Sequence, residues 1–125
     1  MAKNLRIKAQ IHAQPSDVYA ALTNPQMLEI WTGEPAVMST EPNSEFSWWD
    51  GDICGFNRSF EQDRKIVQDW LFDEELSQVT IILTADKKGT YMLIEQENVP
   101  DEVYENIAEG WKETIIASLK ELLEE

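Results

Sequence analysis

The feature that most constrains the fold is an amphipathic stretch near the C-terminal end of the chain. Apolar side chains recur there at steps of three or four residues, which aligns them along one side of an α-helix. At about 1.5 Å per residue, roughly 23 helical residues span about 34 Å, enough to cross a small domain. Because such a stripe must be covered, we expect a helix that opens at Pro100 and lies across a β-sheet. The stripe consists of Val103, Ile107, Trp111, Ile115, Leu119 and Leu122.

The residues before this helix predict the sheet. Residues 5–11 alternate apolar and polar side chains, which is typical of a half-buried strand. Two short helices follow, because Pro15 suits the first position of one and Asn24 suits the N-cap of the other. Runs rich in β-branched and aromatic residues then predict an antiparallel meander, and the chain as a whole, residues 1–125, reads as a single α+β domain. The six meander strands are expected at residues 36–40, 45–49, 53–60, 65–72, 78–84 and 90–97.

Composition limits the function classes. The chain has 24 acidic and 10 basic side chains, so its formal net charge is −14. Because phosphate binding depends on Lys and Arg, we expect no nucleic-acid partner and no anionic membrane surface as partner. The single cysteine, Cys54, forms no internal disulfide, and no stretch approaches the ~20 apolar residues of a membrane span. Residues 1–10 lack the apolar region of a signal peptide, so we expect a cytoplasmic protein.

Few residues suggest catalysis. The only histidine, His12, follows the first predicted strand. Cys54 lies in a strand-like run with no Lys, Arg or helix N-terminus adjacent in sequence, so we expect an inert thiol. Asp50-Gly51-Asp52 reads as a hairpin turn, since no third ligand follows at calcium-loop spacing. No phosphate loop, nucleophile elbow or zinc spacing is present. We therefore expect no enzyme activity, no metal and no cofactor.

Aromatic side chains are the candidates for a binding site. Five tryptophans are many for a core of this size, and Trp48 and Trp49 would point to opposite faces if both lay in a strand. Gly110, inside the last helix, predicts close packing of that helix on the sheet. The aromatic side chains either fill the space under the helix or line a pocket for a small hydrophobic or aromatic ligand. The candidates to line such a pocket are Trp31, Phe46, Trp48, Trp70, Met92, Trp111 and Ile115.

Several motifs in order resemble one family. They are Pro15-x-x-Val18-Tyr19-x-Ala21-Leu22-Thr23-x-Pro25 followed by Trp31; Glu45-Phe46-x-x-x-x-Gly51-x-x-x-Gly55; Lys65-Ile66-Val67-Gln68-x-Trp70; Ser77-x-Val79-Thr80-Ile81-x-Leu83; Thr90-x-Met92-x-Ile94; and Val99-Pro100 followed by Gly110-Trp111. This set resembles the family of the activator of heat-shock-protein-90 ATPase homologue, in the START-like and polyketide-cyclase-like superfamily. The resemblance implies a helix-grip fold, in which a curved antiparallel sheet wraps around a long C-terminal helix. It also implies a domain like the C-terminal domain of the activator, without the activator's separate N-terminal domain.

Three functional hypotheses follow. The first is a non-enzymatic binding domain with a chaperone partner, which would contact the acidic outer face of the last helix; residues 95–125 hold ten acidic and two basic side chains, a net charge of −8. The second is a carrier or sensor of a small hydrophobic ligand in a cavity between sheet and helix. The third is a cyclase- or hydrolase-like enzyme of the kind that the superfamily contains. We expect a monomer or a weak homodimer in each case.

Overall fold

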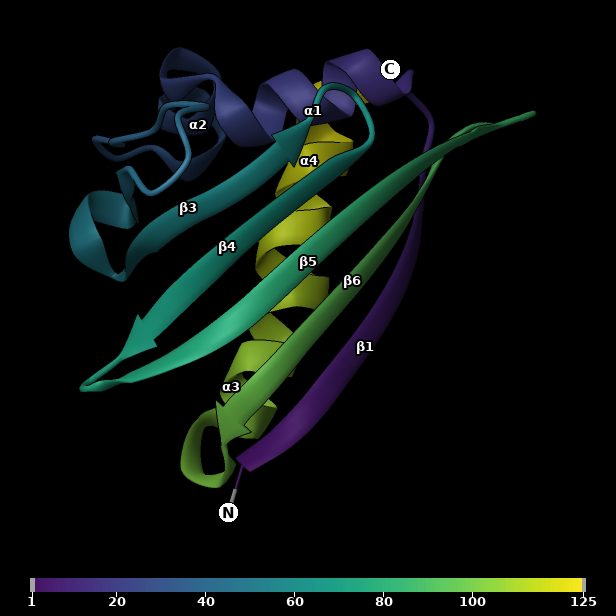
Figure 1. The fold of residues 1–125 in the computed structure, drawn as a ribbon. Helices are drawn as coiled ribbons and strands as arrows, with labels where there is room; N and C mark the ends of the chain where they lie inside the picture. Colours follow the sequence, from purple (N-terminus) through teal and green to yellow (C-terminus); the bar gives the residue numbers. More distant parts are fainter. Residues whose placement is uncertain (1, 125) are drawn as a thin grey trace.

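The computed structural model describes residues 2–124, which form one six-stranded antiparallel sheet with a helix across it (Figure 1). Neighbouring strands follow the order β1-β6-β5-β4-β3-β2, so the chain meanders from β2 to β6 and β1 closes the far edge. The strands are β1 (Ala2–Ile11), β2 (Glu45–Trp48), β3 (Ile53–Glu61), β4 (Lys65–Phe72), β5 (Glu75–Asp86) and β6 (Gly89–Pro100). The predicted α+β helix-grip architecture is confirmed.

The C-terminal helix is built from four segments in succession. A 3₁₀ turn (Asp101–Val103) leads into α3 (Tyr104–Glu109), a π-helical segment (Gly110–Ile115) and α4 (Ile116–Leu123). Figure 1 shows this helix crossing behind the strands. The prediction that Pro100-Asp101-Glu102 opens the helix is confirmed, because Pro100 is the N-cap of the 3₁₀ turn and Asp101 and Glu102 lie in that turn. Pro100 is also the last residue of β6, where it pairs with Ala2. Proline tolerates this place because an edge or end position does not require its missing N–H.

The π-helical segment agrees with the spacing of the apolar stripe. From Val103 to Leu119 the stripe advances by four residues at each step, whereas an α-helix turns once in 3.6 residues. An uninterrupted α-helix would therefore rotate the stripe gradually away from the sheet. A π-helical turn takes up an extra residue, since its hydrogen bonds join residues i and i+5. Trp111, Ile115 and Leu119 are all fully buried as a result.

The two short helices form as predicted. In α2 (Pro25–Thr32), the side chain of Asn24 accepts hydrogen bonds from the backbone N–H groups of Gln26 and Met27, at 2.8 and 3.2 Å. The residue before α1 (Pro15–Thr23), Gln14, makes no such cap. Helix α2 ends at Gly33, whose φ of 77° is a left-handed conformation that favours glycine. Thus one helix is closed at both ends by its own sequence.

The strand predicted at residues 36–40 does not form. Only an isolated bridge joins Val37 to Ser47, through the two hydrogen bonds that their backbones exchange at 2.9 Å. Proline residues at 35 and 42 flank this segment and cannot donate to a ladder, which limits pairing to one residue. The meander after α2 therefore has five strands, and residues 36–40 form an extended connection along the edge strand β2.

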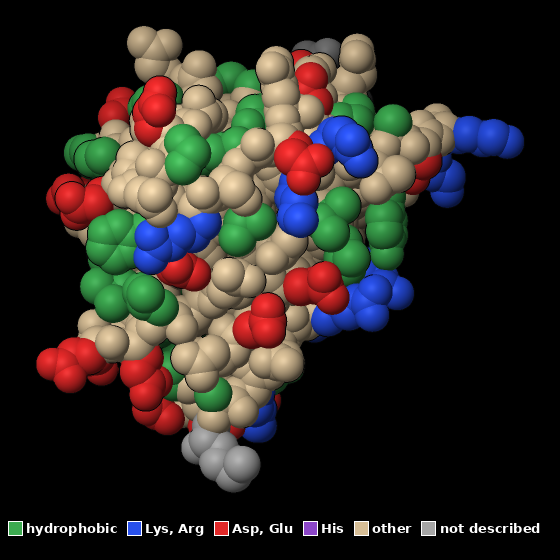
Figure 2. Space-filling view, viewed as in Figure 1, with side chains coloured by type: hydrophobic (Ala, Val, Ile, Leu, Met, Phe, Trp, Pro, Cys, Tyr) green, Lys and Arg blue, Asp and Glu red, His purple; other side chains and the backbone are tan. Residues whose placement is uncertain are grey.

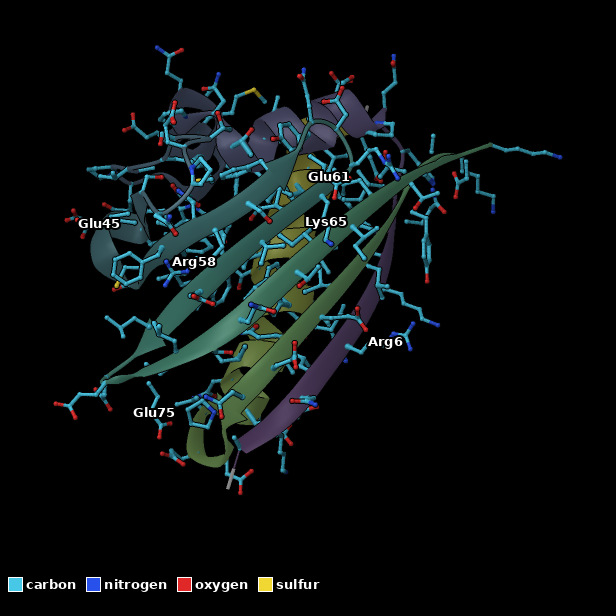
Figure 3. The ribbon with its side chains drawn as sticks, viewed as in Figure 1. Arg6, Glu45, Arg58, Glu61, Lys65 and Glu75 are labelled. Carbon is cyan, nitrogen blue, oxygen red and sulfur yellow. The ribbon has the colours of Figure 1, made fainter. Side chains whose placement is uncertain are left out.

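The outer face of the sheet is open to solvent. On it, Arg58 forms an ion pair with Asp69 and stacks over the ring of Phe56 at 5.2 Å. Figure 3 shows Arg58 and Lys65 on strands of this face, and Figure 2 shows acidic, basic and hydrophobic side chains intermixed there. This mixture is typical of an antiparallel sheet with only one face covered. The core therefore lies on the other face, between the strands and the C-terminal helix.

Candidate functional site

A cleft of about 310 Å³ lies between the turn after β2 and the C-terminal helix. One wall comes from the sheet and the β2–β3 turn, and the other from α3 and the π-helical segment. Its surface is mostly apolar, with a few polar side chains at intervals. The lining residues are Trp49, Asp52, Ile53, Trp70, Asn106, Ile107, Gly110, Trp111, Thr114 and Ile115.

Two stacked indoles connect the walls of the cleft. Trp70 of β4 and Trp111 of the π-helical segment lie nearly parallel, with ring centroids 5.0 Å apart and an interplanar angle of 16°. Each is almost completely buried, at 2% and 1% exposure. The stack holds the helix to the sheet at this point, and its edge contributes to the cleft. Such offset stacking contributes about 0.5–1.5 kcal/mol beyond the burial of the rings.

A row of buried polar side chains fixes the orientation of both rings. The polar members are Asn57 of β3, Gln68 of β4 and Gln96 of β6, and the apolar Val79 of β5 lies between Gln68 and Gln96 in the register. All four side chains are buried. The indole N–H of Trp70 donates to Gln68 Oε1 at 3.0 Å, and that of Trp111 donates to Gln96 Oε1 at 2.8 Å. These two N–H groups are therefore used inside the protein and do not face a ligand.

The polar row continues to hydrogen-bond partners at both ends. Gln68 Nε2 donates to Asn57 Oδ1 at 3.0 Å, and Asn57 Nδ2 donates to Ser44 Oγ at 3.1 Å. On the other side, Gln96 Nε2 donates to Ser77 Oγ at 3.1 Å. A satisfied chain of this kind keeps buried amides stable and favours one side-chain arrangement. The row thus fixes the orientation of Trp70 and Trp111, which line the cleft.

Trp48 and Trp49 both lie on the inner side of the molecule. Strand β2 ends at Trp48, so the alternation of a strand does not extend to Trp49. Trp49 begins a 3₁₀ turn with a φ of 53°, and its ring meets that of Trp31 edge-on at 5.5 Å. The prediction that these two side chains point to opposite faces is wrong for this reason. Trp49 is half-buried at the cleft and, among the described residues, its indole N–H has no hydrogen-bond partner.

Gly110 does not mark a tight contact with the sheet. A Cβ built at this position would meet no atom within 4 Å, and the residue lines the cleft. The prediction of close packing at Gly110 is therefore wrong. The required glycine is Gly55 of β3, where a Cβ would overlap the backbone oxygen of Asp69. Opposite Gly55 in the register is Trp70.

The structure separates the seven predicted pocket residues into two groups. Trp70, Trp111 and Ile115 line the cleft together. The other four belong to the aromatic and aliphatic core beside it or above it: Trp31 meets Trp48 at 5.8 Å, Phe46 meets Trp48 at 5.6 Å, and Met92 is fully buried in β6. Among the described residues, the buried indole N–H of Trp48 has no hydrogen-bond partner.

Several cleft residues are absent from the sequence-based set. Ile107 belongs to the apolar stripe, so its place under the helix could have been found from periodicity. Asn106, Gly110 and Thr114 each precede a stripe residue, so they lie on one side of that stripe, where they also line the cleft. Asp52 and Ile53 arrive there through the β2–β3 turn, whose path is not visible in the sequence.

The ionisable groups of the cleft are few. Asp52 is its only carboxylate among the described lining residues, and neither His12 nor the half-buried thiol of Cys54 lines it. Over residues 2–124, no three His, Cys, Asp or Glu side chains come together as a metal site would require. Away from the cleft, burial raises the pKa of Tyr19, and the negative charge of Asp63 raises it further. No helix within the described range has the length and hydropathy needed to cross a membrane.

Comparison with known proteins assigns the family. The sequence model described as "Activator of Hsp90 ATPase homolog 1-like protein" matches residues 12–124. The chain belongs to this family. A relative from Dictyostelium discoideum, described as an activator of 90 kDa heat shock protein ATPase homolog, is 32% identical over 123 residues. The match covers 94% of this chain and 32% of that relative, so the chain spans about a third of its length.

Solved structures of other proteins share the fold. An Hsp90 activator from Plasmodium falciparum superposes with a TM-score of 0.87 at 21% identity, covering 95% of this chain and 94% of that chain. A protein from Mesorhizobium loti superposes with a TM-score of 0.85 at 21% identity, and the match covers 96% of both chains. The protein CalU16 from Micromonospora echinospora superposes with a TM-score of 0.84 at 19% identity, covering 97% of this chain and 74% of that one. At these identities the likeness establishes the fold alone.

Proposed function

We propose that this chain is a cytoplasmic, non-enzymatic binding domain that associates with an Hsp90-type chaperone. The observation that carries the proposal is the 32% identity to a relative named for that chaperone, over 94% of this chain. The cleft supports a non-enzymatic role, because its described lining offers one carboxylate and no nucleophile–base pair. Binding is proposed separately from stimulation of the chaperone's ATPase, since the chain spans only a third of that relative.

The chaperone would contact the acidic outer side of the C-terminal helix. Three glutamates along it are exposed and lie away from the buried stripe, where they present negative charge to a basic partner surface. Exposed charge pairs contribute about 0.2–1 kcal/mol each and are screened by salt. The three residues are Glu105, Glu109 and Glu113.

Calorimetric titration of a purified Hsp90 chaperone with this chain tests the proposal. We expect binding at low ionic strength that weakens as salt rises, and a loss of about tenfold in affinity for a variant with all three helix glutamates changed to glutamine. The matched control neutralises three exposed glutamates elsewhere, at Glu41, Glu74 and Glu75, and should bind normally. Absence of binding at low salt would overturn the chaperone proposal. Equal loss in both variants would move the contact away from the helix.

The cleft favours a second function, binding of a small hydrophobic or aromatic molecule. Its volume of about 310 Å³ is at the lower end of small-molecule sites, and stacked indoles provide a flat apolar wall. The free indole N–H of Trp49 offers one hydrogen-bond donor that would orient such a molecule. A neutral ligand fits best, because the one carboxylate in the described lining, Asp52, would repel an anion.

Fluorescence of the neutral dye phenylnaphthylamine tests the cleft. We expect the dye to brighten on binding and to quench the tryptophans beside it. Thr114→Phe, at the mouth of the cleft, should block it, whereas Ala117→Phe, exposed on the same helix and outside the cleft, should not. Unchanged dye binding in Thr114→Phe would place any ligand elsewhere, and no binding to the unmodified chain would exclude this function for the cleft.

A further inference from the structure

A basic groove lies at the opposite edge of the molecule from the cleft, between β1 and the C-terminal helix. Its volume is about 520 Å³. Four of the chain's ten basic side chains line it, and none of the described lining residues is acidic. In a chain with a net charge of −14, this concentration of positive charge is unexpected. We define the groove by its lining residues, Arg6, Ile7, Lys8, Ala9, Gln10, Lys112, Ile116 and Lys120.

The cations of the basic groove are largely uncompensated. Lys8, Lys112 and Lys120 are exposed, and among the described residues none of them forms an ion pair. Arg6 lies 3.8 Å from Glu95 Oε2, in a pair that is mostly exposed and therefore weak. Figure 3 shows Arg6 projecting from β1 at the margin of the sheet. The groove thus presents positive charge that is available to a partner.

The backbone of β1 is available as well. This strand pairs only with β6 and forms one edge of the sheet, as Figure 1 shows. An edge strand presents unpaired N–H and C=O groups to which an extended chain can add. Lysine on an edge strand commonly prevents such addition, which would account for Lys8. It does not account for Lys112 and Lys120, which reach the same groove from the helix.

We propose that the basic groove binds an acidic peptide segment in extended conformation, which adds to the sheet as a strand beside β1. Because successive residues of β1 face opposite sides of the sheet, carboxylates on one side of the segment would pair with Arg6 and Lys8. Lys112 and Lys120, which reach the groove from the helix, would flank the other side of the segment and attract its negative charge. Alternate side chains would contact the apolar floor formed by Ile7, Ala9 and Ile116, of which Ile7 and Ile116 are buried. This inference does not rest on the proposed function, because neither the cleft nor the acidic side of the helix takes part in it.

Other occupants fit the basic groove less well. A second copy of this chain would pair through the same edge, and antiparallel pairing of β1 with β1 would set Arg6 and Lys8 against the same residues of the other copy. Like charges directly opposite one another destabilise a sheet. Nucleic acid would meet repulsion from the net charge of −14. A short acidic peptide would contact only the positive charge of the groove. It therefore avoids both the repulsion between like cations of two copies and the repulsion by the net charge of the chain.

Fluorescence anisotropy with a labelled peptide of alternating Glu and Val tests the proposal. We expect binding at low salt that weakens as salt rises, and weaker or no binding of matched peptides that alternate Gln with Val or Lys with Val. The variant Lys112→Glu/Lys120→Glu should lose about tenfold or more in affinity. The control Lys87→Glu/Lys88→Glu makes the same change in net charge at the exposed β5–β6 turn, and should bind the peptide as the unmodified chain does.

Hydrogen exchange distinguishes strand addition from attraction by charge alone. On addition of the Glu–Val peptide, backbone amides of β1 that face the free edge should gain protection, while those bonded to β6 stay as they were. Failure of the peptide to bind, equal binding of the Gln–Val peptide, or an equal loss in both double variants would overturn the proposal. Binding without protection of β1 would also overturn it. No chaperone is present in these assays, so their failure leaves the proposed function untouched.

Discussion

At the scale of single residues, the cleft depends on buried amides that join the two stacked tryptophans to the sheet. Gln96 accepts from Trp111 and donates to Ser77, and it is fully buried. A buried polar group that loses its partner costs about 1–3 kcal/mol, because it was also removed from water. Replacing one member of this row therefore affects its neighbours more than the loss of a single hydrogen bond would suggest.

We predict that Gln96→Leu lowers the free energy of unfolding by about 1–3 kcal/mol, since it leaves the indole N–H of Trp111 without an acceptor. Chemical denaturation monitored by tryptophan fluorescence measures this change. Gln78→Leu on β5 is the control, because Gln78 is exposed, and it should stay within about 0.5 kcal/mol of the unmodified chain. An equal effect of both substitutions would show that the buried row does not contribute specifically.

At the scale of elements, the C-terminal helix combines a strong apolar stripe with a weak point at Gly110. Glycine in a helix interior costs about 1 kcal/mol relative to alanine, through backbone entropy. The space beside Gly110 is open, so nothing in the structure opposes a Cβ there. The residue instead leaves room at the mouth of the cleft, in the segment where the helix widens into π geometry.

We predict that Gly110→Ala raises the free energy of unfolding by about 0.5–1 kcal/mol, measured by thermal and chemical denaturation. Gly55→Ala is the contrasting variant. It should lower stability by about 1–3 kcal/mol or more, because its Cβ would overlap the backbone of Asp69 in the neighbouring strand. A destabilised Gly110→Ala would mean that the π-helical segment itself requires glycine.

At the scale of the whole molecule, charge is unevenly distributed over a tightly packed fold. The net charge of −14 makes the compact state repel itself, and the basic groove offsets this only locally.

We predict that raising sodium chloride from low to moderate concentration raises Tm, by roughly 4 °C for each kcal/mol of repulsion that is screened. Differential scanning calorimetry at several salt concentrations measures this. A fall in Tm would show that specific ion pairs, such as Arg58–Asp69, outweigh the general repulsion.

Much of the fold could be predicted from the pattern of apolar and polar residues along the chain. The alternation in residues 5–11 and the period of the apolar stripe each depend only on neighbours along the chain, so they predict a strand and a helix correctly. Gln68 and Gln96 could have been placed inside by the same rule, since each is two residues from a buried apolar side chain in its strand. The segment at 36–40 has strand-like composition, but only one of its residues, Val37, pairs with a neighbouring strand. Pairing depends on tertiary structure, so composition alone could not show that this strand fails to form.

The sequence by itself determined the order of most elements and the side of each that is buried, because these follow from periodicity and from residue types at short range. The family followed from the ordered motifs that resemble it. Only the tertiary structure decided which side chains meet. Trp49 reaches the cleft through a left-handed turn rather than through a strand, and Gly110 borders the cleft instead of packing against the sheet. Lys8 and Lys112, far apart in the sequence, share a groove because the last helix lies beside the edge strand. Contacts of this kind depend on how elements cross in space, which no local pattern specifies.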